Sequence, residues 1–257
     1  MSARFSGRIV LVTGAASGIG AAFARLAAGE GAAGLALLDR NGDGLAALVE
    51  SLDCPAVTAA GDVSDSDLWS RFEADITERF GRLDFALAGA GIGHKMAPIA
   101  ELEPEAWSRV IGVNLTGAFL TLRTGLRLMA EGGAIVLIAS SMGLKPSANS
   151  AGYGASKAAL IHLAKIAALE AAPRKIRVNA ISPGGVETPI FREHAFFGAL
   201  VDQTGSERGA FDALAARTPL GRYASPEETA GLIAFLMSDE AAQITGANLV
   251  ADAVMTL

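Results

Sequence analysis

A glycine-rich stretch near the start of the chain constrains the fold more than any other feature. Residues 13–20 read Thr-Gly-Ala-Ala-Ser-Gly-Ile-Gly, after the apolar run 9–12 and before a helix-forming run over residues 21–30. A strand, a glycine turn and a helix in this order favour a dinucleotide-binding unit. Gly14 would allow the tight turn, Gly18 the approach of a pyrophosphate, and Gly20 close packing of helix on strand. The helix N-terminus would offer free N–H groups to the phosphates, and the predicted contacts are Gly14, Ser17, Gly18, Ile19 and Gly20.

Asp39 strengthens this interpretation, because a three-glycine pattern also occurs in ordinary turns. Asp39 closes a second apolar run, residues 35–38, roughly 20 residues further on, where a carboxylate accepts the hydroxyls of the adenosine ribose. The 2′-phosphate of NADP would lie against the same carboxylate, so the sequence predicts NAD(H) as the cofactor. Arg40 follows directly, and we expect it to stack on the adenine or to lie in solvent.

The composition narrows the class of protein. The chain has 257 residues, 51% of them hydrophobic, and a formal net charge of −6, which fits one α/β domain with a sizeable core. The lack of a basic block argues against a nucleic-acid partner, and no apolar run reaches the ~18 residues of a membrane span. Residues 1–6 lack the apolar run of a signal peptide, so we expect a cytoplasmic protein. Cys54 is the single cysteine and the histidines lack metal-binding spacing, so neither a disulfide nor a metal site is predicted.

Apolar runs alternate with helical patterns along the whole chain. We predict strands at residues 9–12, 35–38, 57–60, 83–88, 134–139, 176–181 and 247–250. Predicted helices cover residues 21–30, 65–80, 104–130, 153–172 and 226–238, with Ser64 and Ser225 as N-caps. This alternation predicts a single α/β domain over residues 1–257: a Rossmann fold, with a doubly wound parallel sheet of about seven strands and helices on both faces.

One segment interrupts the alternation. Residues 187–217 are rich in aromatic side chains and follow neither the strand pattern nor the helix pattern. Long irregular insertions in compact domains are commonly active-site lids, and the glycines at 198, 205 and 209 lower the rigidity of this one. We therefore expect a mobile lid that orders over cofactor and substrate.

Further motifs follow in a fixed order: Asp62-Val63, Asn114, Ser140 and Tyr153-x-x-x-Lys157. This order resembles the short-chain dehydrogenase/reductase family in its single-domain form, where the first pair contacts adenine and the others form the catalytic set. Residues 183–189 resemble the segment that wraps the nicotinamide in that family, which implies contacts from Pro183, Gly184, Val186 and Thr188. The resemblance covers nearly the whole chain, and it adds Tyr153 and Lys157 to the expected cofactor contacts.

Hydride transfer at a carbonyl carbon requires a proton to move at the oxygen, and Tyr153 is the predicted acid or base. A free tyrosine has a pKa of ~10, but Lys157 lies one helical turn later, and its charge, with that of an oxidised nicotinamide, should lower the Tyr153 pKa. Ser140 can hydrogen-bond the substrate oxygen, and the resemblance implies that Asn114 orients a water linking Lys157 to solvent. An isolated Tyr-x-x-x-Lys would rather indicate a packed tyrosine and a solvated lysine, but its agreement with the other motifs favours catalysis.

Two segments depart from the family pattern. The family's Asn-Ala-Gly after the fourth strand appears as Ala88-Gly89-Ala90-Gly91, so Ala88 lacks the side-chain amide, while Ala88, Gly89 and Ala90 are still expected to border the cofactor. The family's Asp-Gly-Gly near the C-terminus appears as Asp252-Ala253-Val254, which bears on the last turn and on subunit contacts. The apolar helices at 104–130 and 153–172 nevertheless predict a homo-oligomer, with a homotetramer as the expected form.

The resemblance implies an NAD-dependent oxidoreductase that moves a hydride between nicotinamide and a small-molecule secondary alcohol or ketone. Two alternatives stay open: a non-catalytic dinucleotide-binding sensor or scaffold on the same fold, and an epimerase or dehydratase that uses bound cofactor. Candidate substrate contacts are His94, Ser140, Met142, Phe191 and Phe197, with Met96, His194 and Phe196 as further candidates. Packing explains the apolar ones equally well, and a polar position on the rim is the simpler explanation for His94.

Overall fold

The computed structural model describes residues 3–193 and 195–257, and within these ranges one parallel sheet forms the centre of the fold. Its strands lie in the order β3-β2-β1-β4-β5-β6-β7. Their bounds are β1 Ile9–Thr13, β2 Gly34–Asp39, β3 Ala56–Ala60, β4 Leu83–Ala88, β5 Met129–Ile138, β6 Arg177–Pro183 and β7 Asn248–Ala251. The chain thus builds outward from β1 in one direction and then restarts at β4 in the other, which confirms the doubly wound α/β fold.

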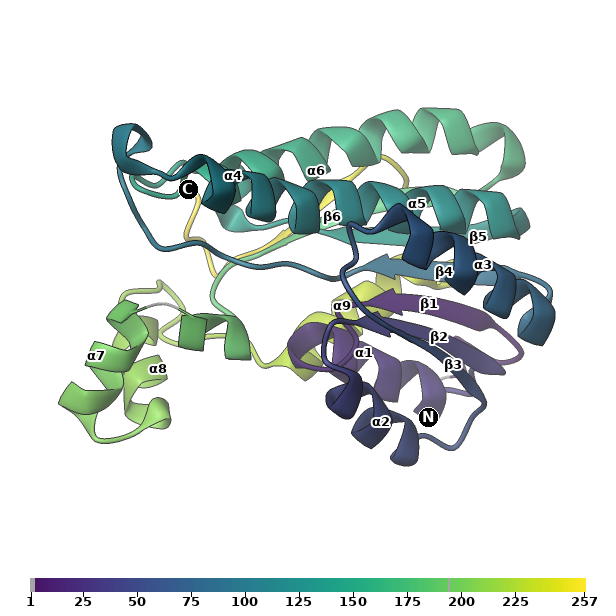
Figure 1. Ribbon diagram of the computed structural model, residues 1–257, viewed down its shortest axis with the longest axis horizontal. Coiled ribbons are helices and arrows are strands. Elements are labelled where there is room, and N and C mark those ends of the chain that lie inside the picture. The colour runs from purple at the N-terminus through teal and green to yellow at the C-terminus, as the bar shows by residue number, and fades with distance from the viewer. Residues whose placement is uncertain (1–2, 194) are drawn as a thin grey trace.

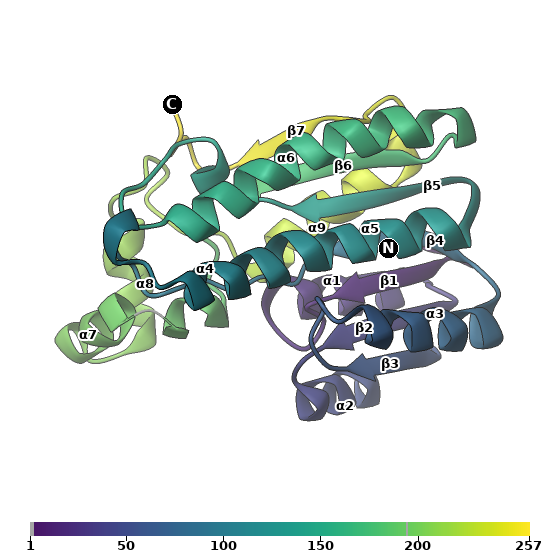
Figure 2. The same cartoon turned by 45° about the horizontal axis from the view of Figure 1, so that its top comes forward.

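Helices cover both faces of this sheet (Figure 1). The described helices are α1 Gly18–Gly29, α2 Gly42–Glu50, α3 Ser66–Phe80, α4 Pro104–Ile111, α5 Gly117–Leu128, α6 Ala151–Ala171, α7 Ala195–Thr204, α8 Glu207–Ala215 and α9 Pro226–Met237. α3, α5 and α6 pack on one face, and α1, α2 and α9 on the other (Figure 2). α7 and α8 project from one end of the molecule, away from the sheet.

The alternation of side chains along each buried strand divides the core in two. Leu11 packs on the α3, α5 and α6 side, where Trp69 and Phe72 are almost fully buried. Val10 and Val12 face the opposite side, where Phe5 makes edge-to-face contacts with Phe23 and Phe85. Successive side chains of a strand point to opposite faces, so short apolar runs suffice to bury the sheet on both sides.

Three predicted helix boundaries or assignments need correction. α2 was not expected, because Gly42 and Gly44 weaken its helical pattern; the Asn41 side chain caps it by accepting from the Gly44 N–H at 3.0 Å. The N-cap of α3 is Asp65 and not Ser64, since the Ser64 hydroxyl and N–H both donate to Asp62. The helix predicted over 104–130 contains a π-helical turn at Gly112–Thr116 and ends at Leu128.

The 187–217 segment is not irregular. It contains a 3-10 turn at Pro189–Glu193 followed by α7 and α8. Phe191, Phe197, Phe211 and Tyr223 contact one another through their rings, with centroids 4.8 to 6.3 Å apart. Phe191, Phe197 and Phe211 of this segment therefore form a small aromatic core together with Tyr223, which follows it.

Candidate active site

A cavity of about 680 Å³ lies at the carboxyl ends of the strands, where the chain direction reverses between β1 and β4. Such a reversal point is where open α/β sheets bind their ligands. Most of the predicted site residues line this cavity: Gly14, Ser17, Gly18, Ile19, Gly20, Asp39, Arg40, Asp62, Val63, Gly89, Ala90, His94, Ser140, Met142, Tyr153, Lys157, Pro183, Gly184, Val186, Thr188 and Phe191. Residues distant in sequence are thus brought together by the ends of six parallel strands, β1 to β6, and the turns that follow them.

Three predicted site residues do not line the cavity. Ala88 is the last residue of β4, is 2% exposed and packs in the core, because its strand position faces α5. The following residue, Gly89, borders the cavity instead. Phe197 is buried in the aromatic core of the 187–217 segment, and Asn114 is fully buried behind the cavity wall. His194 lies outside the described residues.

The glycine loop has backbone contacts that side chains would block. Gly14 has φ +69°, and a Cβ there would lie 2.8 Å from the backbone N of Ala90. A Cβ at Gly20 would collide with the carbonyl oxygen of Gly14. The loop is therefore folded back on the start of α1, as the approach of a pyrophosphate to a helix N-terminus requires.

Asp39 connects the glycine loop to the end of β2. Its Oδ2 accepts a hydrogen bond from the Ala16 N–H at 3.0 Å, and its Oδ1 accepts from the Asn41 N–H at 2.9 Å. Each carboxylate oxygen has more than one acceptor site, so both can still receive a ribose hydroxyl. These two bonds fix the carboxylate at the cavity wall, where it presents a negative charge.

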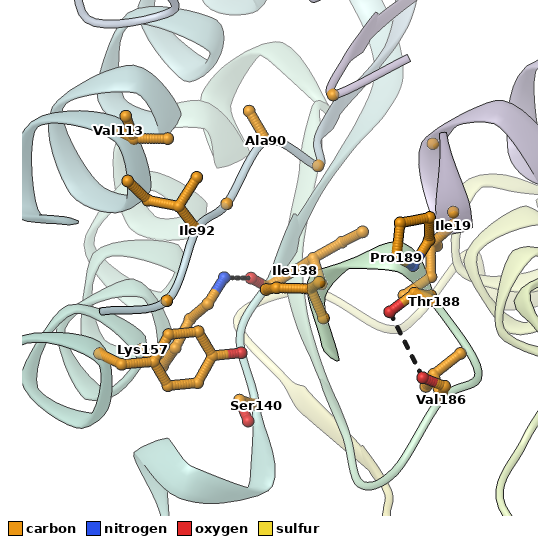
Figure 3. Close-up of a pocket in the computed structure, with 18 of the residues that line it drawn as sticks. Ile19, Ala90, Ile92, Val113, Ile138, Ser140, Lys157, Val186, Thr188 and Pro189 are labelled. Carbon is orange, nitrogen blue, oxygen red and sulfur yellow. Dashed lines mark hydrogen bonds between the residues drawn. The ribbon is translucent and has the colours of Figure 1, made fainter. Parts of the chain in front are cut away.

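Ser140 and Lys157 lie close to Ile138, the last residue of β5 (Figure 3), and Tyr153 lines the same cavity. Lys157 Nζ donates to the carbonyl oxygen of Ile138 at 2.7 Å and lies 5.6 Å from the centre of the Tyr153 ring. Ser140 Oγ accepts from the Met142 N–H at 3.2 Å, which fixes the serine at the start of a short 3-10 turn. Tyr153 and Lys157 share one face of α6, because they are one turn apart, and that face is directed at β5.

Burial is the main cause of the pKa shifts of Tyr153 and Lys157. It raises the pKa of the Tyr153 hydroxyl, against the opposing effect of its hydrogen bond with Ser140. Burial also lowers the pKa of the Lys157 ammonium to about 8. In the protein without cofactor the pKa of Tyr153 is therefore raised, and not lowered as expected, because the effect of burial exceeds that of the hydrogen bond with Ser140.

Asn114 lies in the π-helical turn and holds a loop in place. Its Oδ1 accepts from the Ile92 N–H at 2.8 Å, and its amide donates to the Ile92 carbonyl oxygen at 3.0 Å and to Ser156 Oγ at 3.1 Å. Because every group of the side-chain amide has a protein partner, this amide fixes the 89–93 loop against α6. The Asn114 side chain therefore does not need the expected water to satisfy its hydrogen bonds.

Several residues that line the cavity were not predicted from the sequence. These are Ile92, Val113, Ile138, Ile190, Tyr223 and Met255. The first three are close in sequence to predicted residues and could have been found by following the predicted strand ends and helix. Met255 follows the last strand in a segment with no periodic pattern, so no sequence signal marks it.

His94 differs from the other polar residues of the cavity. Its Nδ1 lies 2.7 Å from the carbonyl oxygen of Lys95, to which it can donate. Its Nε2 is buried and has no hydrogen-bond partner among the described residues. The ring packs against Gly152, where a Cβ would lie 3.2 Å from Cδ2, so His94 contacts the first turn of the helix that carries Tyr153.

Two kinds of feature are absent from the described part of the chain. No cluster of three or more His, Cys, Asp or Glu side chains there has an arrangement suited to a metal ion. No helix in the same ranges combines the length and apolar character needed to span a membrane.

Comparison with known proteins agrees with this geometry. Residues 14–256 match a family model described as enoyl-(acyl carrier protein) reductase. The chain is 40% identical over 255 residues to cis-4-hydroxycyclohexanecarboxylate dehydrogenase of Sinomonas cyclohexanicum, covering 98% of each chain. It is 38% identical to D-threitol dehydrogenase of Mycolicibacterium smegmatis, covering 99% of this chain and 95% of that one.

A solved structure gives the same relationship. The crystal structure of levodione reductase superposes with a TM-score of 0.89 at 33% identity, covering 98% of this chain and 99% of that one. Three findings point to one family. The family model matches nearly the whole chain, the named relatives are more than 30% identical, and the solved structure has the same fold. The chain belongs to the short-chain dehydrogenase/reductase family.

Proposed function

We propose that this protein is an NAD(H)-dependent oxidoreductase that interconverts a secondary alcohol and its ketone. The observation that carries the proposal is the convergence of Ser140, Tyr153 and Lys157 in the cavity that Asp39 also lines. A dinucleotide-binding sensor would need the glycine loop and Asp39 but not the other three side chains. Their joint presence supports catalysis over simple binding.

A nicotinamide dinucleotide suits the residues present. Gly14 lets the loop pack directly on the Ala90 backbone. Among the described residues no side chain caps the start of α1, so its N–H groups are available for the pyrophosphate. Asp39 would accept the adenosine ribose hydroxyls, and Asp62 and Val63 would border the adenine. When bound, the cofactor supplies the donor or acceptor of the hydride.

The protein's own residues would handle the proton. In alcohol oxidation Tyr153 takes the hydroxyl proton, and in ketone reduction it donates one to the oxygen. Ser140 donates a hydrogen bond to the same oxygen and stabilises the charge that develops there. Lys157, one turn along α6, stabilises the tyrosinate by its positive charge.

Asp39 supports a preference for NAD(H) over NADP(H). Two like charges ~4 Å apart repel by about 1 kcal/mol in bulk water and by about 4 kcal/mol at an effective dielectric of 20. The 2′-phosphate would also displace the ribose hydroxyl bond, at a loss of about 1 kcal/mol. Together these terms correspond to a preference of roughly a hundredfold or more.

The walls beyond the catalytic group support a compact, largely apolar substrate. Met96, Met142, Ile190, Phe191 and Phe196 are among the residues that line the cavity, together with polar side chains such as His94 and Arg109. Two relatives are named for hydroxycyclohexanecarboxylates, at 40% and 34% identity. We therefore propose a cyclic secondary alcohol or ketone as the substrate class.

A screen of secondary alcohols tests the proposal. Cyclic and open-chain alcohols would be supplied with NAD, and the absorbance of the reduced nicotinamide followed over time. We expect turnover of at least one cyclic alcohol by the wild-type chain and none by Tyr153→Phe. Tight NAD binding without turnover of any alcohol or ketone would instead favour a sensor or scaffold.

A further inference from the structure

The last six residues of the chain form a turn that returns to the active-site cavity. Asp252 follows β7 and is 7% exposed. Its Oδ1 accepts from the Val254 N–H at 3.0 Å and its Oδ2 from the Thr256 N–H at 2.9 Å. The Met255 N–H donates to the Asp252 carbonyl oxygen at 3.1 Å. One buried carboxylate therefore organises the whole turn.

The turn has a backbone conformation that its residues disfavour. Ala253 has φ +53° and Val254 has φ +70°. This left-handed region suits glycine, and a β-branched residue there is an outlier. Such positions persist only where surrounding contacts fix them, and they cluster at functional sites.

Contacts on both sides fix this turn. Lys145 Nζ donates to the carbonyl oxygens of Met255 at 3.2 Å and Leu257 at 3.4 Å. Lys145 follows the 3-10 turn Ser141–Gly143, whose N-cap is Ser140. On the other side, Met255 Sδ lies 3.0 Å from the position that a Cβ at Gly184 would occupy. Met255 is thus held between the segment that carries Ser140 and the segment expected to wrap the nicotinamide.

We propose that Met255 is a specificity-determining residue that limits which ring substituents fit beside the reacting carbon. The inference rests on the proposed function and assigns one wall of its site. Val254 is 48% exposed and Leu257 is 96% exposed, so the strained turn adds little to the core. Its effect is to hold the Met255 thioether at the cavity, where it lines the wall.

Three ketones test this role. The kcat/KM values of 2-tert-butylcyclohexanone and 4-tert-butylcyclohexanone would be measured with NADH, each relative to cyclohexanone. Met255→Ala should raise at least one of these kcat/KM ratios about tenfold or more, and Met255→Phe should lower the same ratio. An effect of this size is expected because a few extra methyl groups on a substrate change kcat/KM by this factor when the pocket wall excludes or admits them. Leu257→Ala is the matched control from the same turn and should leave both ratios unchanged. Ratios within twofold of wild type in both Met255 variants would overturn the inference.

A binding measurement separates this inference from the proposed function. If wild type and all variants reduce none of the three ketones, the proposed cyclic substrate class fails, and calorimetric titration of the same ketones into the NADH complex decides the inference. Tighter binding of a tert-butyl ketone to Met255→Ala than to wild type would support the wall assignment. Equal binding, or no binding to either protein, would overturn it.

Discussion

At the residue scale, the site depends on a few side chains whose environments differ sharply. Tyr153 and Lys157 are both removed from water, whereas Asp39 is only partly buried at the cavity wall. Burial disfavours a charge and exposure tolerates it. The proposed function assigns the proton transfer to the first pair and the binding of the adenosine ribose to Asp39.

Tyr153→Phe should abolish turnover and leave NAD affinity within a few-fold of wild type. The phenyl ring keeps the packing on α6 and removes only the hydroxyl, and loss of a general acid or base lowers rates by about 10² to 10⁴. Steady-state kinetics and calorimetric titration with NAD measure the two effects. Retention of most of the wild-type rate would exclude Tyr153 as the acid or base.

Asp39→Ala should narrow the preference for NAD over NADP by roughly tenfold or more, since it removes both the repulsion of the 2′-phosphate and the bond to the ribose. The measurement is kcat/KM for each cofactor in wild type and variant. Asp43, an acidic residue in the first turn of α2, offers a control: Asp43→Ala should leave the ratio close to that of wild type. A wild-type preference for NADP would refute the role of Asp39.

Lys157 should give the protein a distinctive dependence of stability on pH. Its folded pKa of about 8 lies below its ordinary value of 10.5, so between these values the unfolded chain binds more protons and the free energy of unfolding rises with pH. Above pH 10 the raised pKa of Tyr153 acts in the opposite direction. Urea unfolding of wild type and Lys157→Met between pH 8 and 10 should therefore show a rise in wild type that the variant lacks. If the free energy of unfolding changed with pH in the same way in both proteins, the lowered pKa of Lys157 would be contradicted.

At the element scale, regular strands were predictable and irregular segments were not. Runs such as Ile9–Thr13 are buried along their whole length, so their apolar character appears directly in the sequence. α2 contains two glycines that its Asn41 cap and its packing on the sheet override. The contribution of Met255 depends on a turn fixed by Asp252 and Lys145, which only the folded chain brings together.

The 187–217 segment should become protected when cofactor binds. It follows the 183–186 turn that lines the cavity, and Phe191 and Phe196 reach the same cavity from it. A lid of this kind closes over bound ligand. Hydrogen exchange with and without NAD should show protection in α7 and α8 that rises by about tenfold or more. Equal, strong protection in both states would indicate a fixed element.

At the scale of the whole molecule, several apolar side chains remain exposed on neighbouring helices. Phe119 on α5 is 48% exposed, and Ile166 and Leu169 on α6 are 42% and 79% exposed. α5 and α6 lie side by side on one face (Figure 2). An apolar surface of this kind commonly marks contact between subunits.

We therefore predict a homotetramer in solution. Closed dihedral symmetry would bury the α5 and α6 face against a second copy and a further surface against the other pair. Sedimentation velocity at micromolar concentration should give a single species of four chains, and Leu169→Glu should shift it toward smaller species. A wild-type protein that sediments only as a monomer would contradict the prediction.

The aromatic core of the 187–217 segment has a consequence for how proteins of this shape diversify. Phe191, Phe197, Phe211 and Tyr223 pack on one another, and Arg192 pairs with Glu207 inside the same segment. Together with Tyr223, the segment thus supplies a small interior that is separate from the two cores on the faces of the sheet. A change in this segment can therefore alter the part of the cavity wall that Phe191 and Phe196 form, while Ser140 after β5 and Tyr153 and Lys157 on α6 keep their positions.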